Sequence, residues 1–188
     1  MSSDDPTLRA PETAQLLIRD SRDDDLGAIT AIYAHYVPTS AATFETEPPD
    51  LAEMTRRRAA VLAAGLPYLI AEVNGAVAGY AYATIYRGRL AYRFTAEDSI
   101  YVHHAYVRAG IGRALLAALI ESCEARGCRQ MIAVISDGVT TGSIRLHERA
   151  GFEMAGTLRS VGFKFGRWID TVRMQRALGE GDSTLPEV

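Results

Sequence analysis

The chain has 188 residues, which suits one globular domain whose core needs neither disulfides nor a metal to hold it together. Hydrophobic residues make up 48% and charged residues 23%, a balance that excludes an intrinsically disordered protein. The 20 basic and 23 acidic residues give a net charge of −3, which argues against a nucleic-acid partner because phosphate binding favours a surplus of positive charge.

The sequence also restricts where the protein works. Its two cysteines, Cys123 and Cys128, are too few for a disulfide framework or a four-cysteine zinc site and indicate reduced thiols, with a local disulfide as the alternative. No stretch approaches the roughly 20 apolar residues of a membrane span. The first residues, MSSDDP, are acidic and lack the basic and apolar regions of a secretory signal. We therefore expect a cytoplasmic protein with no membrane partner and no metal site.

Residues 16–178 are expected to form a single domain, because no repeat, linker or long charge run divides them. The flanking residues, 1–15 and 179–188, are polar and predict flexible tails. The predicted elements are a strand at 16–19, helices at 26–38 and 50–64, strands at 66–73, 76–86 and 99–103, a helix at 111–126, a strand at 131–135, a helix at 143–150 and strands at 152–161 and 168–175. This β-α-α-β-β-β-α-β-α-β-β order indicates a mixed α/β fold.

Local signals set the clearest boundaries. The acidic run from Asp23 to Asp25 is an N-cap region for the first helix, and Pro38 is expected to end that helix. Asn74-Gly75 between two apolar runs predicts a β-hairpin, because this dipeptide favours the tight turns that join antiparallel strands. The helix that starts at residue 111 has an apolar face from Leu115 to Cys123, so we expect it to pack on the sheet.

The loop Arg108-Ala-Gly-Ile-Gly-Arg113, between a strand and this helix, carries the strongest chemical signal. Glycine lets the backbone approach a ligand closely, and the first N–H groups of a helix are unpaired and lie at the positive end of its dipole. The loop therefore favours a phosphate or pyrophosphate. The alternative is that these glycines only turn the chain, since the loop lacks the third glycine of a dinucleotide-binding motif and the Lys-Ser/Thr of a P-loop.

This loop and its helix resemble the coenzyme-A signature of the GNAT acetyltransferase superfamily, and Leu146-His-Glu-Arg-Ala-Gly-Phe152 is similar to that superfamily's next helix-to-strand element. Further stretches resemble the phosphinothricin and methionine-sulfoximine N-acetyltransferases within that superfamily. These stretches are residues 32–48, residues 91–97 directly before Asp98-Ser-Ile-Tyr-Val, and residues 156–175. The resemblance covers about residues 16–178 in the right order. It implies a GNAT-like fold, in which helices flank a central and mostly antiparallel sheet, and it implies acetyl-CoA as the cosubstrate.

The resemblance implies that the cofactor strand and loop bind acetyl-CoA, mostly through backbone groups. The implied cofactor-binding residues are Ile100, Tyr101, Val102, Val107, Arg108, Ala109, Gly110, Ile111, Gly112, Arg113 and Thr140. Two positions depart from the superfamily pattern. Val107 stands where Gln or Arg is usual, and residues 136–143 contain no Asn, so Thr140 or Thr141 is expected to substitute.

Two residues are implied to be catalytic. Glu97 lies where the related enzymes carry the general base that removes a proton from the amine, although it is alternatively an exposed acid in a turn that enters a strand. His147 lies where many superfamily members place a tyrosine that protonates the departing thiolate, which an imidazole can also do. Its alternative is a structural helical histidine. His103 and His104 lie near the cofactor strand and have a weaker case.

The family suggests an acceptor pocket formed by Phe44, the segment 86–94 with Tyr92, and the turn 164–168. Arg87 and Arg93 are candidates for binding a substrate carboxylate, because guanidinium binds carboxylate through two hydrogen bonds. The alternatives are solvated surface arginines and ordinary core aromatics.

The expected function is transfer of acetyl from acetyl-CoA to the α-amine of a small amino-acid analogue of the phosphinothricin or methionine-sulfoximine type. The mechanism is direct attack in a ternary complex, since neither cysteine lies where a nucleophile would be needed. The alternatives are acetylation of a protein N-terminus or other amine, and a non-catalytic acyl-CoA-binding module. We also expect a homodimer, with the aromatic turn 162–170 near the partner's acceptor pocket.

Overall fold

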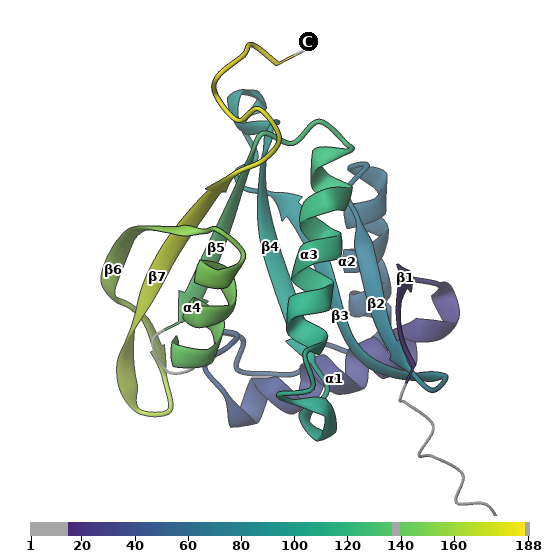
Figure 1. Ribbon diagram of the computed structural model, residues 1–188. Coiled ribbons are helices and arrows are strands. Elements are labelled where there is room, and N and C mark those ends of the chain that lie inside the picture. The colour runs from purple at the N-terminus through teal and green to yellow at the C-terminus, as the bar shows by residue number, and fades with distance from the viewer. Residues whose placement is uncertain (1–14, 137–139, 187–188) are drawn as a thin grey trace, which may run out of the picture.

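The computed structural model describes residues 15–136 and 140–186, and over this range seven strands form one sheet with helices on both faces (Figure 1). In chain order the elements are β1 (Leu16–Asp20), α1 (Leu26–Thr39), α2 (Leu51–Ala63), β2 (Tyr68–Val73), β3 (Ala76–Ile85), β4 (Thr95–Val102), α3 (Ile111–Glu124), β5 (Gln130–Ser136), α4 (Thr140–Arg149), β6 (Glu153–Lys164) and β7 (Arg167–Ala177). This order confirms the mixed α/β fold predicted from the sequence.

The strand order of the sheet is β1-β2-β3-β4-β5-β7-β6, and all neighbours are antiparallel except β4 and β5. These two parallel strands pair only from Thr95–Glu97 to Gln130–Ile132. Beyond Glu97 they separate, as Figure 1 shows, so the second half of β4 has an unpaired edge in the middle of the sheet. Backbone N–H and C=O groups along such an edge are available to an extended ligand.

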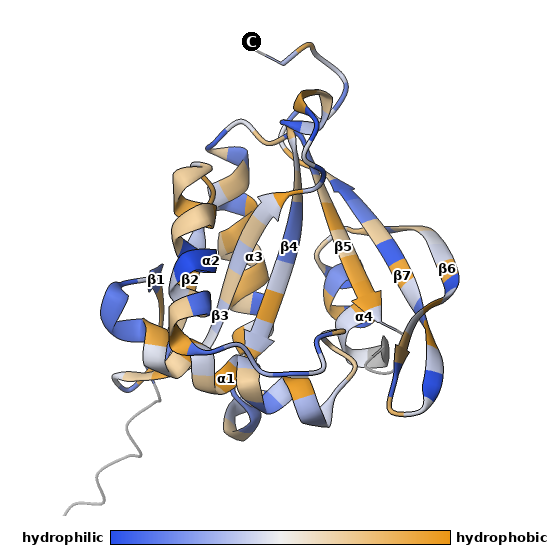
Figure 2. Ribbon diagram, turned by 180° about the vertical axis from the view of Figure 1, so that it is seen from behind, coloured by the Kyte–Doolittle hydropathy of each residue, from blue (hydrophilic) through white to orange (hydrophobic). Residues whose placement is uncertain are grey.

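The two faces of the sheet are covered unequally. In Figure 1, α3 and α4 lie in front of the sheet, and α2 lies behind it. Figure 2, from behind, shows that α2 covers the half formed by β1 to β3, whereas no helix covers β5 and β7 on that side. Accordingly Val134 is 40% exposed although it lies in the middle of β5. This half of the sheet is therefore open to a ligand.

Tyrosines make the wall between β4 and α1 rigid. Tyr80 is fully buried, and its ring stacks at 5.2 Å from that of Tyr101 and at 5.8 Å from that of Tyr68. Tyr33 of α1 packs edge-on against Tyr101 at 5.1 Å. Each aromatic ring buries a large apolar area. Tyr101 of β4 therefore packs β4 against both β3 and α1.

Several boundaries differ from the sequence predictions. α1 continues one residue past its predicted end at Pro38, to Thr39, because the proline removes only one hydrogen-bond donor in the last turn. β4 begins at Thr95, since its first residues pair with both neighbouring strands. β6 continues through Lys164, so the expected turn shrinks to Phe165-Gly166, both with positive φ.

The segment after β7 makes defined contacts as far as it is described. Leu178 is fully buried, and its N–H donates to the carbonyl of Arg129. The Arg129 guanidinium in turn donates to the Thr184 hydroxyl at 2.8 Å. Residues 1–14 of the predicted N-terminal tail lie outside the described residues. Among the helices that the structure describes, none has the length and apolar character that a membrane span requires.

Candidate active site

Glu97 and Asp98 bring two carboxylates to the point where β4 and β5 separate. Successive strand residues point to opposite faces of a sheet, so the side chains of Glu97 and Asp98 lie on different faces. Glu97 lies opposite Thr84 on β3 and shares the open face with Val134. Asp98 points to the face covered by α3 and α4, where it reaches α4. The gap between the strands connects the two sides.

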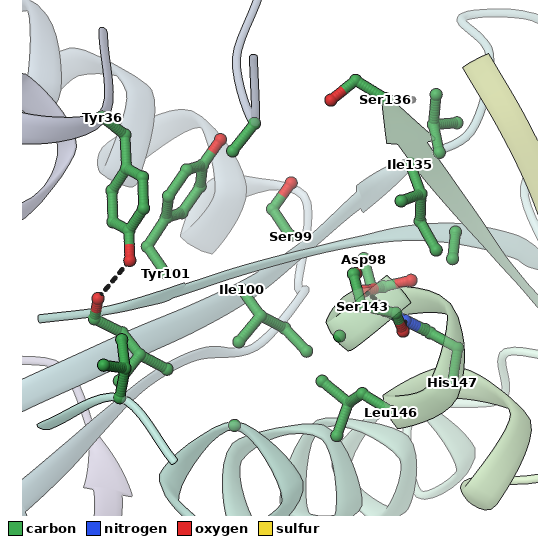
Figure 3. A pocket seen from close by; sticks show the side chains of 17 residues that line it. Tyr36, Asp98, Ser99, Ile100, Tyr101, Ile135, Ser136, Ser143, Leu146 and His147 are labelled. Atoms are coloured by element: carbon green, nitrogen blue, oxygen red, sulfur yellow. Dashed lines mark hydrogen bonds and ion pairs between the residues drawn. The ribbon is translucent and has the colours of Figure 1, made fainter. Parts of the chain in front are cut away.

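A cavity of about 340 Å³ occupies this gap and runs between β4, β5 and α4 (Figure 3). Ile100 and Leu146 face each other across it, with Asp98 and His147 together on one side and Tyr36 and Tyr101 on the other. The Tyr36 hydroxyl donates to the carbonyl of Val102 at 2.5 Å, which ties α1 to the end of β4. The walls are mostly apolar with a few polar groups, a lining that is typical of small-molecule sites.

A second cavity of about 950 Å³ continues from the first one along α3 and α4. Five arginines line it, against two glutamates. The arginines are Arg108, Arg113, Arg145, Arg149 and Arg176, and the glutamates are Glu121 and Glu124. The surplus of positive charge at the start of α3 suits an elongated ligand that carries phosphates.

The glycine loop adopts the conformation that a phosphate site at a helix N-terminus needs. Gly110 is the N-cap of α3 with φ of +79°, a left-handed conformation that favours glycine. Arg108 also has a positive φ of +67°, which is uncommon for a residue with a side chain and marks a constrained loop. Gly112 lines both cavities, and a Cβ atom there would lie 3.5 Å from Leu146.

His147 is held by hydrogen bonds at both ring nitrogens. Its Nδ1 lies 2.8 Å from the carbonyl oxygen of Ser143, and its Nε2 lies 3.1 Å from the Asp98 carboxylate. A carbonyl oxygen can only accept, so Nδ1 carries a hydrogen and donates it, while the Asp98 carboxyl group faces Nε2. Burial would lower the pKa of His147, but the Asp98 carboxylate and the Ser143 carbonyl outweigh it and raise that pKa. The side chain is only 3% exposed and lines the first cavity.

Glu97 is half-buried on the strand rather than exposed in a turn, so the alternative interpretation of this residue is wrong. Burial raises the pKa of Glu97, and the neighbouring Asp98 carboxylate raises it further. The charges of Arg173 and Arg87 partly offset this rise. A carboxylate with a raised pKa is a stronger base, which suits removal of a proton from an ammonium group.

Most of the predicted cofactor residues line one of the two cavities. Those that line the first cavity are Ile100, Tyr101, Val102, Val107 and Gly112, and those added by the second are Arg108, Gly110, Ile111 and Arg113. Ala109 lies in the loop but lines neither cavity. Thr140 begins α4, and its side chain lies outside the described residues, as does that of Thr141. The side chains of His103 and His104 also line neither cavity; they stack on each other at 4.3 Å.

The predicted acceptor residues surround the open face. Phe44 covers Gly162 so closely that a Cβ atom there would lie 2.5 Å from its ring, which explains the glycine. Lys164, expected in the pocket, instead donates to the carbonyls of Ser40 and Thr43 at 2.9 and 2.7 Å. It anchors the loop before Phe44 on the β6–β7 hairpin, because a buried ammonium needs such acceptors.

The remaining acceptor candidates lie on the exposed segment between β3 and β4. Tyr92 packs edge-on against Tyr86 with their ring centroids 5.8 Å apart, and the Arg87 guanidinium lies over the Tyr86 ring at 5.2 Å. Arg93 is exposed and lies over Phe94 at 4.5 Å. The charge of Arg87 acts on the pKa of Glu97, whereas the contacts of Arg93 are made within its own segment.

Sequence reasoning missed several lining residues. Asp98 carries no local signal, because its partner His147 is 49 positions away. Arg145 and Arg149 are four positions apart on α4, so they lie on one face of the helix and would follow from placing α4 beside the cofactor. Arg176 lies on β7, whose register along β5 is not visible in the sequence.

The model of the acetyltransferase (GNAT) family matches residues 29–152, which is most of the domain. The chain therefore belongs to the GNAT acetyltransferase family, as the sequence predicted. It is an acetyl-CoA-dependent N-acetyltransferase, and the charged groove along α3 and α4 fits that cosubstrate.

Individual relatives narrow the comparison. The chain is 59% identical over 170 residues to a phosphinothricin N-acetyltransferase of Alcaligenes faecalis, a match that covers 90% of this chain and 86% of that one. It is 38% identical over 165 residues to an L-methionine sulfoximine/L-methionine sulfone acetyltransferase of Salmonella typhimurium, covering 88% and 96%. The crystal structure of a phosphinothricin acetyltransferase from Sinorhizobium meliloti in complex with AcCoA superposes with a TM-score of 0.88 at 49% identity, covering 93% and 94%.

Proposed function

We propose that this enzyme acetylates the α-amine of a small amino-acid analogue such as phosphinothricin or methionine sulfoximine, in the cytoplasm. One observation carries the mechanism: the Glu97 carboxyl group, whose pKa is raised by burial, and the His147 imidazole, which is bonded to Asp98, lie on opposite faces of the sheet at the gap between β4 and β5. The activities in the names of the relatives support the choice of substrate. The two cysteines, both free and buried, are compatible with a reducing compartment.

Acetyl-CoA enters from the side of α3 and α4, with its pyrophosphate at the start of α3. Its pantetheine arm lies along the unpaired edge of β4 from Ser99 to Val102. There the amide groups of the arm take the place of the backbone groups of a neighbouring strand. The thioester then lies in the gap. The acceptor amine approaches from the open face, next to Glu97.

The reaction is a direct acetyl transfer in a ternary complex. Glu97 takes a proton from the ammonium group, directly or through a water molecule, and the free amine attacks the thioester carbonyl carbon. The new carbon–nitrogen bond forms, the carbon–sulfur bond breaks with its electron pair on sulfur, and the nitrogen releases its second proton to solvent. A protonated His147 donates its Nε2 proton to the thiolate, exchanging its hydrogen bond to Asp98 for one to the sulfur.

Release of free thiol from acetyl-CoA in the presence of different amines tests the function. We expect turnover with phosphinothricin and L-methionine sulfoximine, little with a peptide that has a free N-terminus, and none without an amine. Preferred turnover of the peptide would favour the N-terminal acetyltransferase alternative. Binding of acetyl-CoA without turnover of any amine would favour the non-catalytic alternative.

Asp98→Asn is expected to move the alkaline limb of the kcat profile to lower pH. Asp98 raises the pKa of His147, so the proton donor stays protonated to higher pH and the rate falls as the pH rises through that pKa. The amide removes the charge while burial remains, so the pKa of His147 falls and the rate declines at lower pH. Proton NMR titration of the His147 ring measures the same change without turnover.

Glu97→Gln serves as the comparison, because it removes the acid limb and leaves the His147 titration in place. If NMR shows a lowered His147 pKa in Asp98→Asn and the alkaline limb of kcat does not move, His147 is not the proton donor.

The enzyme is also proposed to form a symmetric homodimer through β6. This edge strand, its turn and the start of β7 expose large apolar side chains: Met154, Leu158, Val161, Phe163, Phe165 and Trp168. An exposed apolar edge strand favours association, and aromatic residues are enriched in interfaces. Light scattering at micromolar concentration is expected to give about twice the chain mass of 20.4 kDa.

Trp168→Ala combined with Phe163→Ala is expected to shift the protein toward monomer. The matched control is Leu90→Ala, which removes an apolar side chain that is 77% exposed on another part of the surface. A 20.4 kDa species in the wild type would contradict the dimer. An unchanged dimer in the double variant would instead exclude this edge as the interface.

A further inference from the structure

Arg173 of β7 shares the open face of the sheet with Glu97. Arg173 pairs with Val134 of β5, and Glu97 pairs with Ile132 of the same strand. Ile132 and Val134 are two residues apart and point to one face, so Glu97 and Arg173 do as well. The charge of Arg173 reaches Glu97 strongly enough to act on its pKa. Neither the sequence patterns nor the mechanism above gives Arg173 a role.

The guanidinium of Arg173 lacks the partners that the other enclosed arginines have. Among the residues that the structure describes, its buried Nε has no hydrogen-bond acceptor, and its Nη1 has a long contact of 3.4 Å with the Tyr86 hydroxyl. By contrast, Arg19 pairs with two carboxylates and Arg58 with Asp23. A sheltered guanidinium without acceptors is unfavourable, so it is suited to receive an anion from a ligand.

The space next to Arg173 is accessible. Val134, its cross-strand neighbour, is 40% exposed, and Figure 2 shows no helix over β5 and β7 on this side. A small molecule on Val134 would therefore have a carboxylate, Glu97, at one end and a guanidinium, Arg173, at the other. A zwitterionic α-amino acid has the complementary pair of charges.

We propose that Arg173 binds the α-carboxylate of the acceptor amino acid. This inference rests on the proposed function, because the amine must lie next to Glu97. The α-carboxylate is attached to the same carbon as that amine, so a partly buried cation on the same face as Glu97 is placed to meet it. Two parallel hydrogen bonds from guanidinium to carboxylate would also orient the amine toward the gap. Arg87 and Arg93, which are more exposed, are then left for the distal group of the substrate.

The test compares L-methionine sulfoximine with its α-carboxamide, which keeps the amine and loses the negative charge. Arg173→Gln is expected to lower kcat/KM for the acid by about 10²-fold and to leave the carboxamide little changed, because only the acid loses a charged partner. Arg173→Lys should fall between the two, since it keeps the charge without the planar fork. Arg56→Gln is the control, because Arg56 is exposed on α2 and, within the part of the chain that the structure describes, pairs only with Glu53. The KM for acetyl-CoA reports that each variant is folded.

The outcomes separate this inference from the proposed function. A wild type that prefers the acid, with a preference that Arg173→Gln retains, overturns the role of Arg173 alone. Equal losses for the acid and the carboxamide, with a higher pKa in the acid limb, would mean that Arg173 acts only on Glu97 and would also overturn it. A wild type that prefers the carboxamide contradicts the proposed substrate class and the inference together.

Discussion

Glu97→Gln is expected to lower kcat by about 10²–10⁴-fold at neutral pH, the usual effect of losing a general base. This corresponds to about 2.7–5.4 kcal/mol of lost transition-state stabilisation. Glutamine has nearly the same shape and keeps a polar group at the half-buried position, so β4 is expected to remain paired on both sides. Affinity for acetyl-CoA should be unchanged, because Glu97 lies on the open face and does not line the cofactor cavities.

The pH dependence gives a second readout of the same residue. Burial and Asp98 raise the pKa of Glu97, so the wild type should gain activity as the pH rises through that pKa and the carboxyl loses its proton. This limb should be absent in Glu97→Gln. The matched control is Glu153→Gln, an exposed carboxylate at the start of β6. A Glu97→Gln enzyme with the wild-type rate and the wild-type acid limb would remove Glu97 from the mechanism.

The sequence predicted the parts of the fold that depend on neighbouring residues. Asn74-Gly75 does join β2 and β3, with positive φ at both positions, because these residues adopt that conformation most easily. Gly110 does cap α3 in a left-handed conformation. Such features depend on a few consecutive side chains, and the resemblance to the GNAT superfamily supplied the order in which they assemble.

The sequence did not predict contacts that depend on strand register. Asp98 meets His147 only because β4 and β5 separate after Glu97 and let α4 approach. Arg173 faces Glu97 only because of the register in which β7 pairs with β5. A shift of one residue would turn either side chain to the opposite face of the sheet, and no local pattern reports that choice.

Gly112→Val is expected to weaken the binding of coenzyme A by about 10²-fold, or about 2.7 kcal/mol. Gly112 lies in the first turn of α3, where the backbone N–H groups are free to meet a phosphate. It also lines both cavities, so the branched side chain of valine would fill the passage between the pyrophosphate site and the gap. Titration calorimetry with coenzyme A measures the loss directly.

Gly112→Ala separates this effect from damage to the fold. A Cβ atom at position 112 would lie 3.5 Å from Leu146 and 3.8 Å from Val102, which are ordinary packing distances. Alanine also favours helix over glycine by about 1 kcal/mol, so this variant is expected to unfold no earlier than the wild type and to bind coenzyme A better than the valine variant. If Gly112→Val is folded and binds coenzyme A with the wild-type affinity, the pyrophosphate is not at the start of α3.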